Sequence, residues 1–143
     1  MKRFLFLSLL LLMAAPVAAE MVSVIHLPAE LRDQPLVART KVITELSRYT
    51  PLEVLGSESD YFKVKDYRGQ VGFIHRSLVG NKDSLVVTAS SCNVRSGPGT
   101  DHPVIFTATR GQSFRALSKQ GEWIEITDNG TIGWIWQKLT WGY

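Results

Sequence analysis

The residues of this chain that are best suited to chemistry lie in one short stretch, CNVRSGPGT, at residues 92–100. The stretch holds the only cysteine of the chain, an asparagine, an arginine and a Gly-Pro-Gly turn. A cysteine nucleophile needs a histidine base and a third, orienting group within hydrogen-bonding reach. The histidines, His26, His75 and His102, fall in different predicted strands or turns, and none has the neighbours of an activated pair. We therefore predict that the protein is not an enzyme and has no catalytic residue.

Metal and cofactor chemistry has no better support in the sequence. A zinc site needs several cysteines or histidines at short spacing, and one cysteine with three scattered histidines does not provide them. Two carboxylates, Asp60 and Glu122, occupy predicted turns 62 residues apart, where they are expected to be solvated. We predict no metal ion and no cofactor.

The first residues have the pattern of a secretory signal peptide. Lys2 and Arg3 precede an apolar run from Phe4 to Ala19 that only Ser8 interrupts, and small residues close it. The alternative is an uncleaved membrane anchor, but the run is shorter than the roughly 20 residues that a spanning helix needs. We predict cleavage of residues 1–19, no stable membrane insertion afterwards, and a periplasmic or secreted location.

The charge of the chain gives no reason to expect a nucleic-acid partner. The full chain has 16 basic and 13 acidic residues, a net charge of +3. Loss of Lys2 and Arg3 with the signal peptide leaves 14 basic against 13 acidic residues, a net charge of +1. The basic residues alternate with acidic ones, so they form no basic stripe of the kind that binds phosphates.

The remaining sequence contains an internal repeat. Residues 55–75 (LGSESDYFKVKDYRGQVGFIH) align with residues 117–136 (LSKQGEWIEITDNGTIGWIW), and one residue is missing from the turn of the second copy. The offset is 62 residues before that turn and 61 after it. Because insertions and deletions are tolerated best in turns, the alignment indicates a duplicated unit. We place the first copy at residues 20–82 and the second at residues 83–143.

Both copies have the pattern of short β-strands. In the second copy, alternation along Trp123–Thr127 predicts a strand with Ile124 and Ile126 facing inward. In the first copy, Tyr61–Lys65 has the same phase, with Phe62 and Val64 inward. Five short strands joined by tight turns in about 60 residues predict an all-β fold, a small closed or nearly closed barrel.

Turns and one ambiguous segment complete the predicted unit. Asp128-Asn129-Gly130 is expected to form a hairpin turn because Asn and Gly tolerate positive φ. Arg110-Gly111-Gln112 is predicted to be a turn that corresponds to Arg48-Tyr49-Thr50. The segment Leu36–Leu46 could be a short amphipathic helix, but its valines and threonines and the repeat alignment favour a strand.

The second copy resembles the bacterial SH3 (SH3b) family of exported and cell-wall proteins. The motifs that carry the resemblance are CNVRSGPGTDHPVI, GEWIEI and GTIGWIW, spread over nearly all of residues 86–140. The first copy resembles the family more weakly through DYFKV and GFIH, and its ELRDQPLVART lacks the glycines of the second copy. The predicted fold is therefore two tandem small SH3-like β-barrels after an N-terminal signal peptide.

The resemblance also suggests where a ligand would bind. Alternation puts Cys92 and Val94 on the buried face of their strand and Asn93 and Arg95 on the other face. Arg95 could cover the end of the barrel or contact a ligand. In SH3 domains an aromatic residue like Trp123 lines the ligand groove. The candidate ligand-binding residues are Trp123, Trp136, Asn93 and Arg95, with Tyr61 and His75 in the first copy.

These expectations favour a binding protein. The resemblance implies an exported, non-enzymatic module that recognises a cell-wall peptide, such as the peptidoglycan stem, through an aromatic groove formed with residues 96–102. One alternative is a periplasmic adaptor that binds another envelope protein. Another is that the tryptophans only cover the barrel ends or pack the copies together, because so small a barrel buries only about 60% of its unfolded surface.

Overall fold

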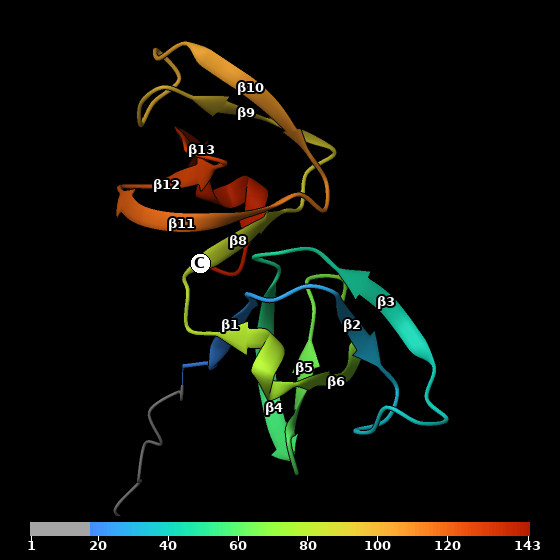
Figure 1. The fold of residues 1–143 in the computed structure, drawn as a ribbon. Coiled ribbons are helices and arrows are strands. Elements are labelled where there is room, and N and C mark those ends of the chain that lie inside the picture. The colour runs from blue at the N-terminus through green and yellow to red at the C-terminus, as the bar shows by residue number, and fades with distance from the viewer. Residues whose placement is uncertain (1–17) are drawn as a thin grey trace, which may run out of the picture.

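The computed structural model describes residues 18–143, so most of the predicted signal peptide lies outside the described residues. The described chain is all-β, as predicted: its 14 strands form two seven-stranded sheets, and its helices are two 3₁₀ turns of three residues each. None of the helices within residues 18–143 has the length and apolar character needed to cross a membrane. Figure 1 shows the two sheets as separate bodies with the C-terminus at their junction.

The N-terminal sheet contains the first seven strands. They are β1 (Met21–Val24), β2 (Ala29–Arg32), β3 (Val42–Leu46), β4 (Pro51–Glu58), β5 (Tyr61–Lys65), β6 (Val71–His75) and β7 (Val79–Gly80), with the helix η1 (Arg76–Leu78) before β7. The C-terminal sheet contains the other seven. They are β8 (Ser84–Val87), β9 (Ser91–Arg95), β10 (Val104–Thr109), β11 (Ser113–Gln120), β12 (Trp123–Asp128), β13 (Thr131–Trp136) and β14 (Thr140–Trp141), with η2 (Gln137–Leu139) before β14.

The two sheets have the same topology. Their strand orders are β3-β2-β6-β5-β4-β1-β7 and β10-β9-β13-β12-β11-β8-β14, which become identical when seven is added to each label of the first. The register agrees as well, since Arg32 pairs with Phe73 where Arg95 pairs with Trp134. Neither sheet closes by hydrogen bonding: β3 and β7 end one ladder, and β10 and β14 end the other. The sheets are therefore open. Of the predicted alternatives, a closed or a nearly closed barrel, the fully closed ladder is wrong.

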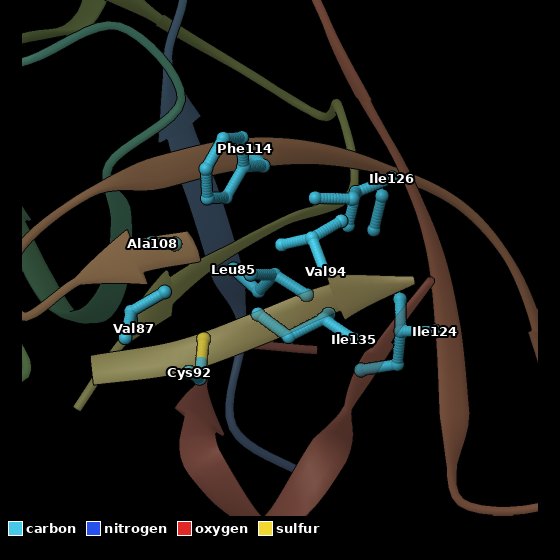
Figure 2. Close-up of a cluster of buried hydrophobic side chains, with 10 residues drawn as sticks. Leu85, Val87, Cys92, Val94, Ala108, Phe114, Ile124, Ile126 and Ile135 are labelled. Carbon is cyan, nitrogen blue, oxygen red and sulfur yellow. The ribbon is translucent and has the colours of Figure 1, made fainter. Parts of the chain in front are cut away.

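Each sheet encloses its own hydrophobic cluster. The C-terminal cluster is drawn in Figure 2, where the side chains of Val94, Ile124 and Ile135 converge from β9, β12 and β13. Ile124 and Ile126 are fully buried, as the alternation predicted. In the N-terminal sheet Val64 is buried, whereas Phe62 is only partly buried. The guanidinium of Arg76 lies over the Phe62 ring, 4.6 Å from its centre.

The turns agree with the repeat alignment. Asn129 and Gly130 have φ of 47° and 88°, which confirms the predicted hairpin turn. Tyr49 adopts a φ of 64° where Gly111 has 88°. Both residues donate their backbone N–H to the end of a neighbouring strand, Tyr49 to the carbonyl of Val24 at 2.8 Å and Gly111 to that of Val87 at 2.9 Å. A tyrosine therefore takes the left-handed conformation that glycine takes in the other half.

The prediction for Leu36–Leu46 is wrong in its first half. Only Val42–Leu46 is a strand, and residues 33–41 form bends and turns. Asp33 closes this loop, since its backbone N–H donates to the carbonyl of Lys41 at 3.1 Å and its Oδ1 accepts from the Lys41 N–H at 2.9 Å. Pro35 lacks an N–H for a strand ladder, and Arg39 has a φ of 61°. Local loop bonds thus replace the ladder that the valines, the threonines and the repeat alignment suggested.

The halves touch through turns rather than through their cores. Thr50 Oγ1 lies 3.4 Å from Ser113 Oγ. Gly142, at a φ of +113°, approaches Pro51 so closely that a Cβ there would stand 2.5 Å from the proline ring. These contacts join strand β4 to the segment around strands β8 and β14 at the junction seen in Figure 1.

Candidate ligand-binding groove

A groove of about 520 Å³ opens on the C-terminal half, on the side of the sheet away from the core. It is assembled from three separate parts of the chain: the end of β9 with the loop that follows, the start of β12, and the end of β13 with η2. The residues that form it include Asn93, Arg95, Thr100, Trp123, Trp136 and Leu139. The structure thus brings together the four C-terminal residues that the sequence singled out. Leu139 was missed, because a 3₁₀ turn leaves no periodic signal.

The two tryptophans are placed by the hairpin of β12 and β13. Trp123 and Trp136 are directly paired across the ladder, and the next pair, Ile124 and Ile135, is fully buried in the core. Because neighbouring residues of a strand point to opposite faces, burial of the isoleucines directs both indoles outward. Trp123 is half-buried and Trp136 is 37% exposed. Trp134 is half-buried and does not line the groove.

Polar groups fix the outer indole. Trp136 Nε1 donates a hydrogen bond of 3.4 Å to Glu122 Oε2. The ammonium of Lys138 lies 5.5 Å from the centre of the Trp136 ring and 3.8 Å from Glu122 Oε1. The carboxylate of Glu122 holds the edge of the ring and the ammonium of Lys138 lies over its face, so the aromatic surface is positioned before a ligand arrives.

Arg95 holds the loop that forms one wall of the groove. Its Nη1 donates to the carbonyl oxygens of Thr100 at 3.1 Å and His102 at 3.0 Å. The His102 ring in turn packs on Gly97, where a Cβ would come within 2.5 Å of Nδ1. Arg95 therefore supports the loop and also lines the groove. Its contact with a ligand stays a prediction.

The N-terminal half has a groove of about 450 Å³ at the equivalent place. Its residues include Glu30, Arg32, Val37, Tyr61, His75 and Leu78. All six correspond to groove residues of the other half at offsets of 61 to 63 residues. Glu30 and Arg32 were missed by the sequence reasoning, although applying the 63-residue offset to Asn93 and Arg95 would have found them.

The aromatic pair of this second groove differs from the tryptophans. Tyr61 and His75 are paired across β5 and β6, and their rings meet edge to face with centres 5.1 Å apart. Tyr61 is only 9% exposed, so it contributes less surface than the exposed aromatic expected at this position. His75 Nδ1 accepts a hydrogen bond of 3.2 Å from the Ser77 N–H and lies 2.7 Å from Ser77 Oγ. These bonds fix the orientation of the imidazole.

Cys92, the only cysteine of the chain, belongs to the core. Cys92 is 5% exposed and packs in the C-terminal cluster, which confirms the predicted burial (Figure 2). Burial raises the pKa of its thiol, so the reactive thiolate is disfavoured at neutral pH. Cys92 lines neither groove. Across residues 18–143, no three histidine, cysteine or carboxylate side chains gather in a way that could hold a metal ion.

Comparison with known proteins agrees with this geometry. Residues 90–140 match the bacterial SH3 domain family. The matched residues begin just before β9 and end in β14, so the match lies within the C-terminal half. The matched residues, which we call the bacterial SH3 region, include every residue that lines the C-terminal groove.

The chain is also similar to parts of larger proteins that are named as amidases. The Bacillus subtilis protein named "Putative N-acetylmuramoyl-L-alanine amidase YrvJ" is 23% identical over 105 residues, which cover 66% of this chain and 20% of that protein. The Staphylococcus aureus "Probable cell wall amidase LytH" is 34% identical over 58 residues, which cover 38% of this chain and 20% of LytH. The chain thus matches about a fifth of the length of these relatives.

A solved structure also aligns along most of the chain. NlpC1 from Trichomonas vaginalis is 11% identical with a TM-score of 0.38, covering 89% of this chain and 47% of NlpC1.

Proposed function

We propose that this protein is an exported, non-enzymatic binding module that recognises a cell-wall peptide, such as the peptidoglycan stem, through the C-terminal groove. The observation that carries the proposal is the pair of outward-facing indoles, Trp123 and Trp136, beside Arg95 within the bacterial SH3 region. Aromatic side chains offer a large contact area at little cost in rotamer entropy, which suits a peptide ligand. The similarity to LytH, which is named as a probable cell wall amidase, supports the cell wall as the source of that peptide.

A binding role fits this chain better than catalysis. The part of the chain that matches the amidases is about a fifth of their length, and their activity is a property of the whole proteins. In the present chain the only thiol is buried in a core, and the groove is formed mainly by aromatic, amide, guanidinium and aliphatic groups, with the hydroxyl of Thr100 and the exposed carboxylate of Asp101 at its edge loop. Such groups bind and orient a ligand but do not form a nucleophile with its base.

We further propose that the chain carries two tandem SH3b units, each a small barrel, after a cleaved signal peptide, and that it acts in the periplasm or outside the cell. The shared strand order of the two sheets and the equivalent grooves support the duplication. The apolar run at the N-terminus supports the export.

Co-sedimentation with purified sacculi tests the proposed ligand. We expect the purified protein to pellet with sacculi and Trp136→Ala to lose most of that binding. Leu117→Ala is the matched control, because Leu117 has a similar exposure, 39% against 37% for Trp136, and lies outside the groove. Failure of the wild-type protein to pellet beside a known wall-binding module would contradict the proposal.

The adaptor hypothesis remains the second candidate, and the same variants distinguish it. If the aromatic groove grips an envelope protein instead of the wall, Trp136→Ala will remove a specific band from a pull-down of envelope extract. In that case the wild-type protein will either not pellet with sacculi at all, or pellet to the same extent as Trp136→Ala. A loss of sacculus binding without loss of any band favours the wall peptide.

A further inference from the structure

The arginine of each groove is in a different electrostatic environment. In the N-terminal groove, Arg32 forms an ion pair with the carboxylate of Glu30 and donates from Nη1 to Thr40 Oγ1 at 2.8 Å. Glu30 lies two residues before Arg32 on the same face of β2, and both side chains are partly buried. The positive charge of this groove is therefore neutralised from within.

The C-terminal groove lacks that carboxylate. The position of Glu30 is occupied by Asn93, and the Arg95 guanidinium donates only to two backbone carbonyls. Throughout residues 18–143, no carboxylate forms an ion pair with Arg95. Asp101 lines the groove, but its side chain is 88% exposed and its Oδ1 lies 3.9 Å from His102 Nε2. Arg95 thus presents a positive charge that no close carboxylate offsets.

Donors remain available beside this charge. A guanidinium has five N–H donors in a planar fork, and both hydrogen bonds of Arg95 come from Nη1, so Nη2 and Nε keep their donors. Asn93 is exposed on the same face of β9, and its Oδ1 accepts from Thr107 Oγ1 at 3.5 Å, which leaves its Nδ2 hydrogens free. A guanidinium fork next to an amide donor matches the two oxygens of a carboxylate.

We propose that the C-terminal groove binds its ligand through a carboxylate held by Arg95 and Asn93, with the apolar part of the ligand lying on Trp123 and Trp136. The residue two positions before the groove arginine then sets the charge preference: Asn93 leaves the arginine free for an anion, and Glu30 occupies it. This inference rests on the proposed function, because it names the chemical class of the ligand in the same groove.

Two probes that differ only in charge test the inference. The acetylated tripeptide Ala-Ala-Ala is used with a free C-terminal carboxylate and as its C-terminal carboxamide. NMR titration follows the indole N–H signals of Trp123 and Trp136 in the purified protein. Because a hydrogen bond to a charged group contributes about 1.5–3 kcal/mol, we expect the acid to bind at least about tenfold more tightly than the amide. We also expect this preference to decrease as salt is added.

Exchanging the two residues tests what sets the preference. Asn93→Glu should abolish the preference for the acid, and Asn93→Gln, which keeps the amide, should retain it. Glu30→Asn should cause the acid to shift the signals of His75 and Ser77 in the N-terminal groove. The wild-type comparison of acid with amide needs no variant, so the inference can be judged even if a substitution impairs folding.

Three results would overturn the inference: equal binding of acid and amide, an Asn93→Glu variant that keeps the preference, or indole signals that move with neither peptide. These outcomes are separable from failure of the proposed function. If Trp136 is required for sacculus binding but acid and amide bind equally, only the charge preference is wrong. If the acid is preferred but the protein does not pellet with sacculi, the groove is anion-selective and its ligand has another source.

Discussion

Gly133 lies against Val94 so closely that a Cβ at position 133 would stand 2.4 Å from Val94 Cγ1. The contact occurs where β13 crosses β9, next to the Arg95–Trp134 pair that joins these strands. Gly72 has the same place in the N-terminal half, where a Cβ would lie 2.7 Å from the carbonyl oxygen of Arg32. Each sheet therefore has a glycine where these two strands cross, and at each crossing the residue after the glycine pairs with the groove arginine.

Substitution at this crossing should destabilise the C-terminal half. We expect Gly133→Ala to lower the free energy of unfolding by about 1–3 kcal/mol, because the added methyl group overpacks a fully buried valine. Gly56→Ala is the matched control, since Gly56 lies in a strand with no atom within 4 Å of its Cβ position. Urea denaturation measures both. Equal stability of the two variants would show that the crossing relaxes without cost.

Cys92 should cause the free energy of unfolding to decrease at alkaline pH. Burial raises the pKa of the folded thiol above its ordinary value of 9.0, whereas the unfolded chain keeps the ordinary value. The folded state therefore retains a proton that the unfolded state loses, and the stabilisation present below pH 9.0 declines as pH rises above it. We expect wild type to lose more unfolding free energy than Cys92→Ala between pH 7 and a pH near 10.

Thiol labelling checks the same burial independently. A disulfide reagent at pH 8 should label native Cys92 slowly and the urea-unfolded protein rapidly, because the thiol is 5% exposed. Rapid, complete labelling of the native protein would contradict the core position of Cys92.

Arg95 should be needed for the order of the groove loop as well as for ligand binding. Its guanidinium bridges the carbonyls of Thr100 and His102, and a lysine cannot reproduce that planar geometry. We expect Arg95→Lys to increase amide hydrogen exchange in residues 96–102 while the exchange of β12 stays unchanged. Unaltered exchange in the loop would mean that packing of His102 on Gly97 is enough to hold it.

Asp66 should stabilise its turn more than its repeat partner Asp128. Asp66 is 2% exposed, and its Oδ1 accepts from the backbone N–H groups of Arg68 at 3.0 Å and Gln70 at 2.8 Å. Removing the acceptor leaves those donors unsatisfied, so Asp66→Ala should cost about 1–3 kcal/mol. Asp128 is only half-buried, and we expect Asp128→Ala to cost less. Thermal unfolding compares the two, and equal losses would contradict the difference.

The sequence by itself determined the features that depend on local pattern. Alternation identified which sides of β9 and β12 face the core, because successive side chains of a strand must point in opposite directions. The Asn129-Gly130 turn followed from the backbone angles that these residues tolerate. The repeat alignment placed equivalent residues at equivalent positions in two sheets of the same strand order.

The tertiary structure decided what depends on contacts between distant residues. The sequence predicted Tyr61 to be an exposed aromatic residue equivalent to Trp123 of the other copy. In the structure it packs against His75 and is only 9% exposed. The loop at residues 33–41 is shaped by bonds between Asp33 and Lys41 that alternation does not encode. The groove itself joins β9, β12 and η2, and the fold decides whether a carboxylate lies close enough to neutralise the charge of Arg95. Pairing partners are set by the three-dimensional path of the chain, so a pattern of residue types could suggest these residues but not their electrostatic environment.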